Sequence, residues 1–433
     1  MIRWTPVLLA LVACGPIGQV EGEVAEAIPT AINVSWTTAA GESSWVEFGP
    51  DENFGYRTAT DTSDSSSRTA TLVGNKPETD VYFRVVHSGA NGERTSATQV
   101  LTTGALPRQL PSLTVEGTNP GVFVSVTQLG SATGPLILDP DGTVVWYTQF
   151  DEELEVYRAS PLMDGSGMVF NAGSVSGDPA ENSRLIKVSW DGADVTEIDV
   201  PFLAHDFVEI APNTFGAIAV EYREVEGEQV RGDSIVEVSP DGTVTTVWSA
   251  WDCFDPIKDN VGAQEGWTFA NALRYFPEED AYYLGKRNFS SITKIPRADF
   301  SCEWTFGDVA ADFKAQPATA RFRRQHQFDF TPDGKMLVFD NDGPVEQESR
   351  ILQYDFDPVA QTATLDWQFT GPFTFVLGDV HYIDGGDTFV TWGAAGQMQR
   401  LNSNQEVTFQ ANTAIGDVFG FSLPLSSLYP GLE

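Results

Sequence analysis

Short runs of alternating apolar and polar residues, separated by turn-forming residues, recur along almost the whole chain. Examples are AINVSWTT from Ala31, LILDPDGTVVWY from Leu136 and FDFTPDGKMLVFDN from Phe328. Such alternation is typical of half-buried β-strands, and the aspartate-glycine pairs are typical of the tight turns between them. We find no long amphipathic helical pattern. The pattern therefore predicts an all-β protein.

The chain divides into two regions. Residues 28–104 contain five short alternating runs and resemble a fibronectin type III or related immunoglobulin-like β-sandwich, with Trp36 expected in its core. Residues 105–111 carry two prolines in a polar setting, which is typical of a linker. A repeat begins after this linker and fills residues 112–433.

Each copy of the repeat contains two hairpins. In the outer hairpin the turn glycines Gly142, Gly192 and Gly242 stand 50 residues apart, and three degenerate copies follow. Six units of two hairpins, with a period near 50 residues, predict a six-bladed β-propeller. We expect the early run GVFVSVTQL (121–129) to pair with the late run DVFGFSLP (417–424), so that the two ends of the region complete one blade.

Polar side chains recur at one fixed distance before the turns of the inner hairpins. Tyr157, His205, Asn271 and His326 each stand eight residues before such a turn. Equivalent positions of propeller blades converge around one axis, so these side chains are expected to form a ring where ligands bind. His381 stands only five residues before its turn and is expected to have mainly a structural role.

The stretch from Arg321 to Gly343 places three arginines beside one of only four histidines in the chain. Arginine offers planar donors for oxyanions, and a neutral imidazole can attack phosphorus or sulfur without a metal. This stretch indicates an anion site with His326 as nucleophile. The alternative is a solvated basic patch beside a structural histidine, and strand alternation leaves open whether Arg323 or Arg324 enters the site.

With 61 acidic and 25 basic residues, the chain has a net charge of −36, which disfavours nucleic acid and anionic lipid surfaces as partners. The segment 1–13 has the pattern of a secretory signal, and Leu11 to Cys14 resembles the lipobox of bacterial lipoproteins. We expect an exported cell-envelope protein, attached to a membrane only through an acyl group on Cys14, with residues 14–27 as a tether. A simple secretory signal is the alternative.

Cys253 and Cys302 remain as a pair that could form a disulfide in an oxidising compartment, or two free thiols. Asp340, Asn341 and Asp342 do not have the spacing of a calcium loop and fit a tight turn better. No cysteine-histidine cluster, phosphate loop or GxSxG motif is present. We therefore expect neither a metal nor a cofactor.

Four segments together resemble the bacterial arylsulfate sulfotransferases. They are HDF at His205, WTFAN ending at Asn271, LGKRNFSSITKI with Arg287, and QHQFDFTPDGKMLVFDNDG with His326. The resemblance implies transfer of a sulfuryl group from a phenolic sulfate ester to another phenol, without a nucleotide donor. It implies His326 as the sulfated nucleophile, assisted by His205 and Arg287. We expect the substrate-binding residues to be Asn271, Phe269, Arg324 and Tyr157.

One position departs from the family pattern. The family motif reads WxHxN, and Phe269 stands where the histidine belongs. Phenylalanine cannot donate a proton, and the loss of a general acid typically lowers a rate by about two to four powers of ten. A non-catalytic surface propeller that binds sulfated or other anionic ligands is therefore the alternative function, and a propeller lyase or hydrolase acting on acidic glycans is a third.

Overall fold

The computed structural model describes residues 18–39, 41–90, 92–107, 110, 113–119, 121–130, 134–148, 155–173, 182–262, 266–343, 347–383 and 385–429. Within these residues the protein is all-β, as predicted, apart from the short 3-10 helices η1 (Ala250–Asp252), η2 (Ala318–Ala320) and η3 (Gly393–Ala395). None of the described helices is long and apolar enough to cross a membrane. The predicted signal segment and Cys14 lie outside the described residues.

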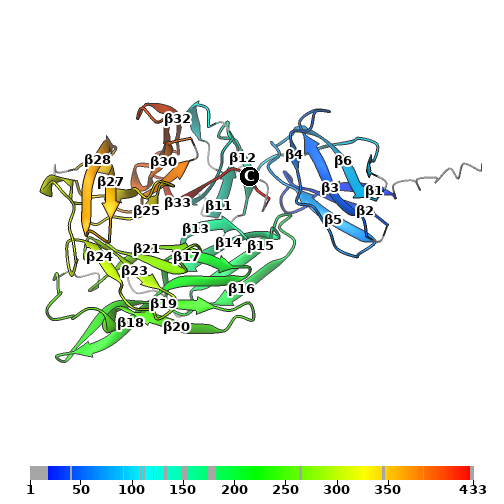
Figure 1. Cartoon of the computed structure of the whole chain (residues 1–433). Coiled ribbons are helices and arrows are strands. Elements are labelled where there is room, and N and C mark those ends of the chain that lie inside the picture. The colour runs from blue at the N-terminus through cyan, green and yellow to red at the C-terminus, as the bar shows by residue number, and fades with distance from the viewer. Residues whose placement is uncertain are drawn as a thin grey trace, which may run out of the picture.

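Two antiparallel sheets form the N-terminal domain (Figure 1). Their apolar faces share one core, in which Trp36, Phe48 and Phe83 are almost completely buried. The first sheet comprises β1 (Val20–Val24), β2 (Ile32–Thr37) and β5 (Ser67–Leu72). The second comprises β3 (Ser43–Gly49), β4 (Tyr56–Arg57), β6 (Asp80–Gly89), β7 (Gly92–Thr95) and β8 (Gln99–Thr102).

This domain begins earlier than predicted. We assigned residues 14–27 to a tether, but Val20–Val24 pair with Ile32–Trp36 as β1. The sequence VEGEV places Glu21 and Glu23 on the exposed face of an edge strand, and this polar face hid the strand in the hydrophobic pattern. The ordered domain therefore includes most of the expected tether.

Six antiparallel sheets of four or five strands follow along the described chain. The first has β10 (Phe123–Leu129), β11 (Gly134–Leu138), β12 (Val144–Tyr147) and β33 (Val418–Leu425). The second has β13 (Glu155–Pro161), β14 (Gly167–Gly173), β15 (Arg184–Ser189) and β16 (Val195–Asp199). The third has β17 (Leu203–Ala211), β18 (Thr214–Val225), β19 (Glu228–Val238) and β20 (Val244–Ser249).

The other three sheets are built in the same way. The fourth has β21 (Ala270–Phe276), β22 (Ala281–Lys286), β23 (Ser291–Pro296) and β24 (Trp304–Gly307). The fifth has β25 (Phe328–Phe330), β26 (Met336–Asp340), β27 (Ser349–Asp357) and β28 (Thr362–Gly371). The sixth has β29 (Asp379–Ile383), β30 (Asp387–Trp392), β31 (Gln397–Leu401), β32 (Val407–Asn412) and β9 (Thr114–Gly117).

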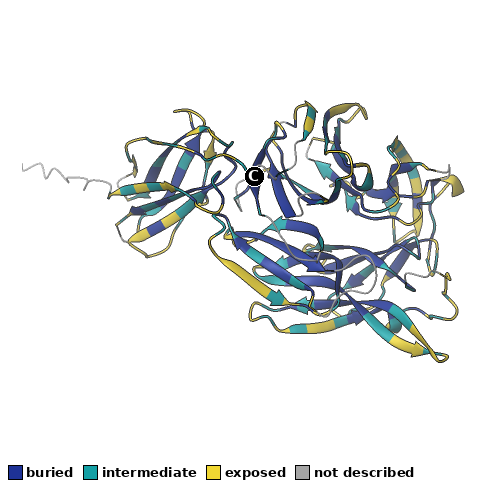
Figure 2. Cartoon of the chain, turned by 180° about the vertical axis from the view of Figure 1, so that it is seen from behind, coloured by how far each residue is buried: buried dark blue, intermediate teal, exposed yellow. Residues whose placement is uncertain are grey.

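The predicted pairing of early and late strands is confirmed. β33 pairs antiparallel with β10 and completes the first sheet, while β9 extends the sixth sheet beyond β32. The inner strands meet at a common centre, because β13 contacts β17, β17 contacts β21, β25 contacts β29, and β33 contacts both β29 and β13. Figure 2 shows that buried residues follow these inner strands, whereas exposed residues gather on outer strands and hairpin tips.

The spaced glycines occupy the turns that the repeat predicts. Gly142, Gly192 and Gly242 have φ values of 79°, 75° and 84° and follow β11, β15 and β19. Residues other than glycine rarely adopt this left-handed conformation. The regular spacing of glycine in the sequence is therefore a direct consequence of one turn geometry used repeatedly.

The N-terminal domain packs closely against the first two repeat sheets. Asn33 donates a 2.9 Å hydrogen bond to Asp191, and the hydroxyl of Tyr429 lies 2.9 Å from both the carbonyl of Thr71 and the N–H of Val73. The predicted linker also packs, because Leu106 and Leu110 contact the core of the first and sixth sheets. Residues 108, 109 and 111 lie outside the described part.

Cys253 and Cys302 form a disulfide with a Cα–Cα distance of 6.3 Å. Cys253 follows η1 beyond the third sheet, and Cys302 precedes β24 of the fourth. The bridge therefore joins two neighbouring sheets on their outer side.

Candidate active site

The four residues that the spacing singles out lie at the starts of inner strands. Tyr157 is in β13, His205 in β17 and Asn271 in β21, while His326 precedes β25. The ring centroids of Tyr157 and His205 are 6.4 Å apart, and Asn271 donates a 2.8 Å hydrogen bond to the carbonyl of Gln325. All four side chains are almost completely buried. The structure thus brings these residues to one level of neighbouring sheets.

Both ring nitrogens of His326 are hydrogen-bonded. Nδ1 lies 2.6 Å from Asn341 Oδ1, and the backbone N–H of Leu377 donates to Nε2 at 2.9 Å. Because a backbone N–H only donates, Nε2 carries the lone pair and Nδ1 carries the proton. Burial lowers the pKa of His326 to about 3, against the opposing effect of the bond to Asn341 and with the aid of the Arg287 charge. At neutral pH His326 is therefore uncharged, and its lone pair on Nε2 accepts the hydrogen bond of Leu377.

His205 is a second neutral imidazole. Burial lowers its pKa well below the usual value, and the charges of Arg231 and Arg287 act in the same direction. Its Nδ1 has no hydrogen-bond partner among the described residues, although the atom is buried. A buried polar atom of this kind usually finds a partner in water or a ligand. His205 is therefore placed to hydrogen-bond a substrate oxygen.

Phe269 contacts two guanidinium groups and the ring of His205. The centres of the Arg231 and Arg287 guanidiniums are 5.1 Å and 5.3 Å from the centroid of the phenyl ring. The ring of His205 meets that of Phe269 edge-on, with centroids 4.9 Å apart. Two positive charges therefore stand next to neutral imidazoles in a chain with a net charge of −36. This arrangement suits a small anion.

Four residues around the site have left-handed backbone conformations that glycine would adopt more easily. The φ values are 45° for His205, 48° for Phe269, 49° for Arg324 and 62° for Leu377. Such conformations cost about 1–3 kcal/mol each and cluster at functional sites. The surrounding sheets hold these residues in place.

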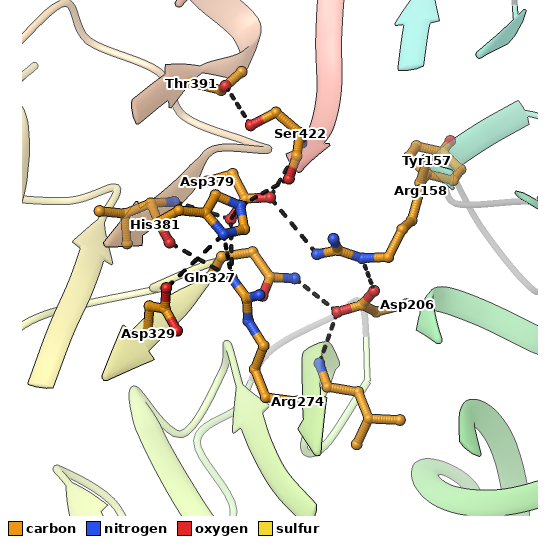
Figure 3. A network of polar contacts seen from close by, with 12 residues as sticks. Tyr157, Arg158, Asp206, Arg274, Gln327, Asp329, Asp379, His381, Thr391 and Ser422 are labelled. Carbon is orange, nitrogen blue, oxygen red and sulfur yellow. Dashed lines mark hydrogen bonds and ion pairs between the residues drawn. The ribbon is translucent and has the colours of Figure 1, made fainter. Parts of the chain in front are cut away.

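A buried polar network lies directly below this level and links the inner strands (Figure 3). Asp206 is ion-paired with Arg158 and accepts hydrogen bonds of 2.7 Å from the side chain of Gln327 and the N–H of Leu273. Arg158 also lies 3.6 Å from Asp379. The network joins the segments that carry Tyr157, His205, Asn271 and His326, and so it fixes their relative positions.

His381 belongs to this lower network, which is consistent with the structural role predicted for it. Its Nε2 lies 2.7 Å from the carbonyl of Ser422 and 3.1 Å from Asp379 Oδ1, and its Nδ1 lies 3.3 Å from Arg274. Burial by itself would raise the pKa of Asp379, but His381, Arg158 and Arg274 hold it below the usual value. The carboxylate therefore stays charged at the centre of the sheets.

The arginines nearest to His326 in sequence lie at the rim. Arg323 and Arg324 are exposed, and the backbone N–H of Arg324 donates to Ser290 Oγ at 3.1 Å. The positive charge beside the imidazoles comes instead from Arg231 and Arg287.

The acidic turn after β26 has specific partners. Asp340 lies 2.8 Å from the guanidinium of Arg350, and Asn341 supports His326. Within the described residues, no three histidine, cysteine, aspartate or glutamate side chains are grouped to hold a metal ion.

Several site residues were not predicted from the sequence. Arg231 lies on the third strand of its sheet, and only tertiary structure shows that it reaches Phe269. Asn341 was interpreted as a turn residue. A usable signal did exist for Arg158, Asp206 and Gln327, because each directly follows one of the spaced residues along the chain.

Comparison with solved structures found distant likenesses. A protein of unknown function from Bacteroides caccae is 11% identical with a TM-score of 0.43, covering 72% of this chain and 100% of that one. A protein from Lactobacillus plantarum is 11% identical (TM-score 0.41; 89% and 99% covered). Virginiamycin B lyase from Staphylococcus aureus is 10% identical (TM-score 0.34; 79% and 94% covered). Scores this low carry no argument about activity.

No curated protein matches the chain. The family model of arylsulfotransferase (ASST) matches residues 113–418, which is well over half of the 433 residues and includes Tyr157, His205, Asn271 and His326. The chain therefore belongs to the arylsulfotransferase family, which supports sulfotransfer in general as its class of activity.

Proposed function

We propose that this protein transfers a sulfuryl group from an aryl sulfate ester to a phenolic acceptor through a sulfated His326. The observation that carries the proposal is the state of that imidazole. It is buried and neutral, with its proton on Nδ1 held by Asn341 and its lone pair on Nε2. A nitrogen in this state is a nucleophile at neutral pH without assistance from a base.

The first half of the reaction begins at Nε2. Its lone pair forms a bond to sulfur while the bond between sulfur and the aryl oxygen breaks, and the electron pair leaves with that oxygen as phenolate. The sulfated ring keeps its Nδ1 proton on Asn341. In the second half the oxygen of the acceptor phenol attacks sulfur, its proton passes to water, and His326 is restored.

Arg287 and His205 are suited to the charge on the transferred group. Arg287 acts electrostatically on both imidazoles, and His205 has a buried nitrogen with no partner among the described residues. Donors already in position where negative charge develops stabilise a transition state without reorganisation. Asn271 Oδ1 also has no partner in the described part of the chain, so this side chain is suited to a neighbouring hydroxyl or water.

In the proposed architecture, the six repeat sheets are the blades of a six-bladed propeller, and the two N-terminal sheets are a fibronectin-like sandwich. The shared contacts of the inner strands and the pairing of β33 with β10 support the first assignment. The site then lies at one mouth of the central channel, where small ligands usually bind in such folds.

We further propose that the protein is an exported lipoprotein of the cell envelope. The lipobox-like segment before Cys14 motivates this, and the disulfide between Cys253 and Cys302 supports an oxidising compartment. Labelling with a radioactive fatty acid in a bacterial host should mark the wild type but not Cys14→Ser. Equal labelling of both would contradict the anchor.

The catalytic proposal is tested with purified protein, 4-nitrophenyl sulfate and a phenol acceptor. Wild type should release nitrophenolate, and after exposure to donor alone its intact mass should increase by one SO₃ group. His326→Ala should show neither change while keeping the wild-type melting temperature. Binding of the donor without any mass change in the wild type would favour a non-catalytic binding protein instead.

A further inference from the structure

A hairpin of the third sheet projects past the other strands and brings a second arginine to the site. β18 and β19 have 12 and 11 residues, whereas their neighbours β17 and β20 have 9 and 6. β17 pairs with β18 only as far as Leu203 with Ala219, on the side where His205 lies. Figure 1 shows the hairpin extending beyond the rest of its sheet. Arg231 lies on this projecting part.

The structure fixes Arg231 against the site at two points. Its backbone carbonyl accepts a 2.8 Å hydrogen bond from the N–H of Trp267, and its guanidinium faces the ring of Phe269. Gly266 lies against the Arg231 side chain, since a Cβ there would come within 3.1 Å of its Cδ. The hairpin and the segment that carries Phe269 therefore form one packed wall of the site.

We propose that Arg231 contacts the aryl oxygen of the donor and stabilises the departing phenolate by charge rather than by proton transfer, which restricts efficient donors to sulfates of acidic phenols. This inference rests on the function proposed above. It assigns a role to Arg231 and predicts which aryl sulfates react rapidly.

The described site offers charge but little acidity. His205 and His326 are neutral, because burial lowers the pKa of each. Phe269 has no proton to give, and the hydroxyl of Tyr157 is hydrogen-bonded to the carboxylate of Glu155. Arginine stays protonated at any pH at which the enzyme would work, so it stabilises an anion without becoming an acid.

The two arginines reach Phe269 from different segments. Arg231 lies on the projecting hairpin, whereas Arg287 follows β22 and its backbone N–H donates a 2.9 Å hydrogen bond to the carbonyl of Phe269. The charge of Arg287 also helps to lower the pKa of both His326 and His205. In a displacement the nucleophile and the leaving oxygen stand on opposite sides of sulfur, and in this proposal Arg287 acts on the sulfuryl oxygens and Arg231 on the oxygen that departs.

Two guanidiniums lie at one phenyl ring and repel each other. The negative face of the aromatic ring offsets part of that repulsion. Phe269 therefore keeps both arginines at the site. It cannot itself donate a proton.

The test compares donors whose phenols differ in acidity: the 4-nitrophenyl, 4-cyanophenyl, unsubstituted phenyl and 4-methylphenyl sulfates, with saturating 2-naphthol as acceptor. In the wild type, log kcat/KM should decrease clearly as the pKa of the leaving phenol rises, because charge alone only partly stabilises the phenolate. In Arg231→Gln the dependence should become steeper, with a loss of about 100- to 1,000-fold for phenyl sulfate and a much smaller loss for 4-nitrophenyl sulfate. The slope for Arg231→Lys should lie between those for wild type and Arg231→Gln.

If Arg231 had only a structural role, Arg231→Gln would lower kcat/KM by the same factor for every donor. Parallel lines for wild type and Arg231→Gln, at equal melting temperatures, would overturn the proposal. If Arg231→Gln does not fold, Arg231→Met keeps the apolar stem and replaces it in the same comparison. The proposed function is tested separately. Full activity of His326→Ala would show that His326 is not the nucleophile, whatever the dependence of log kcat/KM on the pKa of the phenol.

Discussion

The backbone N–H of Leu377 donates a hydrogen bond to Nε2 of His326, the nitrogen that carries the lone pair. Asn341 holds the other side of the ring, and its amide also donates 2.8 Å bonds to the carbonyls of Thr374 and Leu377. One amide side chain therefore fixes both the tautomer of His326 and the segment that covers its lone pair. Attack on sulfur requires Leu377 to give up this bond.

We predict that Asn341→Ala lowers kcat strongly, by about 100- to 10,000-fold, because the proton of His326 is then no longer held on Nδ1. KM for the donor should change much less. Steady-state kinetics of the variant measure both, and circular dichroism shows whether the fold is kept. A proportional change in KM with unchanged kcat would mean that Asn341 acts only on substrate binding.

Asn341→Asp gives a more specific test of the same hydrogen bond to His326. A carboxylate at this position would stabilise the protonated imidazole and raise the pKa of His326. The acidic limb of kcat/KM should therefore move to higher pH in Asn341→Asp, an effect that a loss of packing would not produce. An unmoved limb would show that His326 is not the group that titrates.

The activity of the wild type should not fall as the pH drops through the ordinary range of histidine titration. With the pKa of His326 at about 3, the nucleophile stays uncharged at mildly acidic and neutral pH. We expect kcat/KM for 4-nitrophenyl sulfate to be nearly constant between about pH 5 and 8. A clear acidic limb near pH 6.5 would contradict the assignment.

The stability of the fold should depend on pH through the same two histidines. The unfolded chain takes up protons on these histidines below about pH 6.5, whereas folded His326 does not until about pH 3 and folded His205 also resists protonation. Stability is therefore complete above about pH 6.5 and falls as the pH decreases, by up to about 1.4 kcal/mol per pH unit for each group. Urea unfolding of wild type and His326→Ala at several pH values measures the difference.

Phe269→His should restore a hydrogen-bonding ring nitrogen beside the two arginines. We expect the rate with phenyl sulfate to rise by at least about tenfold and the rate with 4-nitrophenyl sulfate to change less. Phe269→Leu is the matched control, because it removes the aromatic face without adding a donor. Similar kinetics of the two variants would show that only the volume at this position matters.

Cys302→Ser should lower the stability of the oxidised protein by about 2–4 kcal/mol, since the bridge closes a long loop between two sheets. Thermal melts with and without a thiol reductant test this. The reductant should lower the melting temperature of the wild type and leave that of Cys302→Ser unchanged. Identical melts of both proteins under oxidising conditions would contradict the expectation.

The sequence was most informative where one geometry recurs. Gly142, Gly192 and Gly242 are evenly spaced because each turn needs a positive φ, and the same regularity placed Tyr157 and His205 at the starts of neighbouring inner strands. A repeated constraint leaves a repeated pattern, so the all-β class and the pairing of both ends of the repeat region could be read from one sequence.

Features that occur only once could not be predicted in this way. Arg231 reaches Phe269 because one hairpin is longer than its counterparts, and Asn341 meets His326 across two strands of the same sheet. The edge strand that contains Glu21 has too few apolar positions to show an alternating pattern. Each depends on contacts between residues distant in sequence or on exposure, which periodicity does not encode.

The position of β33 has a consequence for biogenesis. Until this strand arrives, the inner edge of β10 has unpaired N–H and carbonyl groups, although β10 lies near the opposite end of the repeat region. An open edge of this kind pairs readily with foreign strands. A chain interrupted before Val418 would therefore lack Phe421 and Ser422 at the centre and would be prone to aggregate, so quality control has a simple structural signal for incomplete molecules.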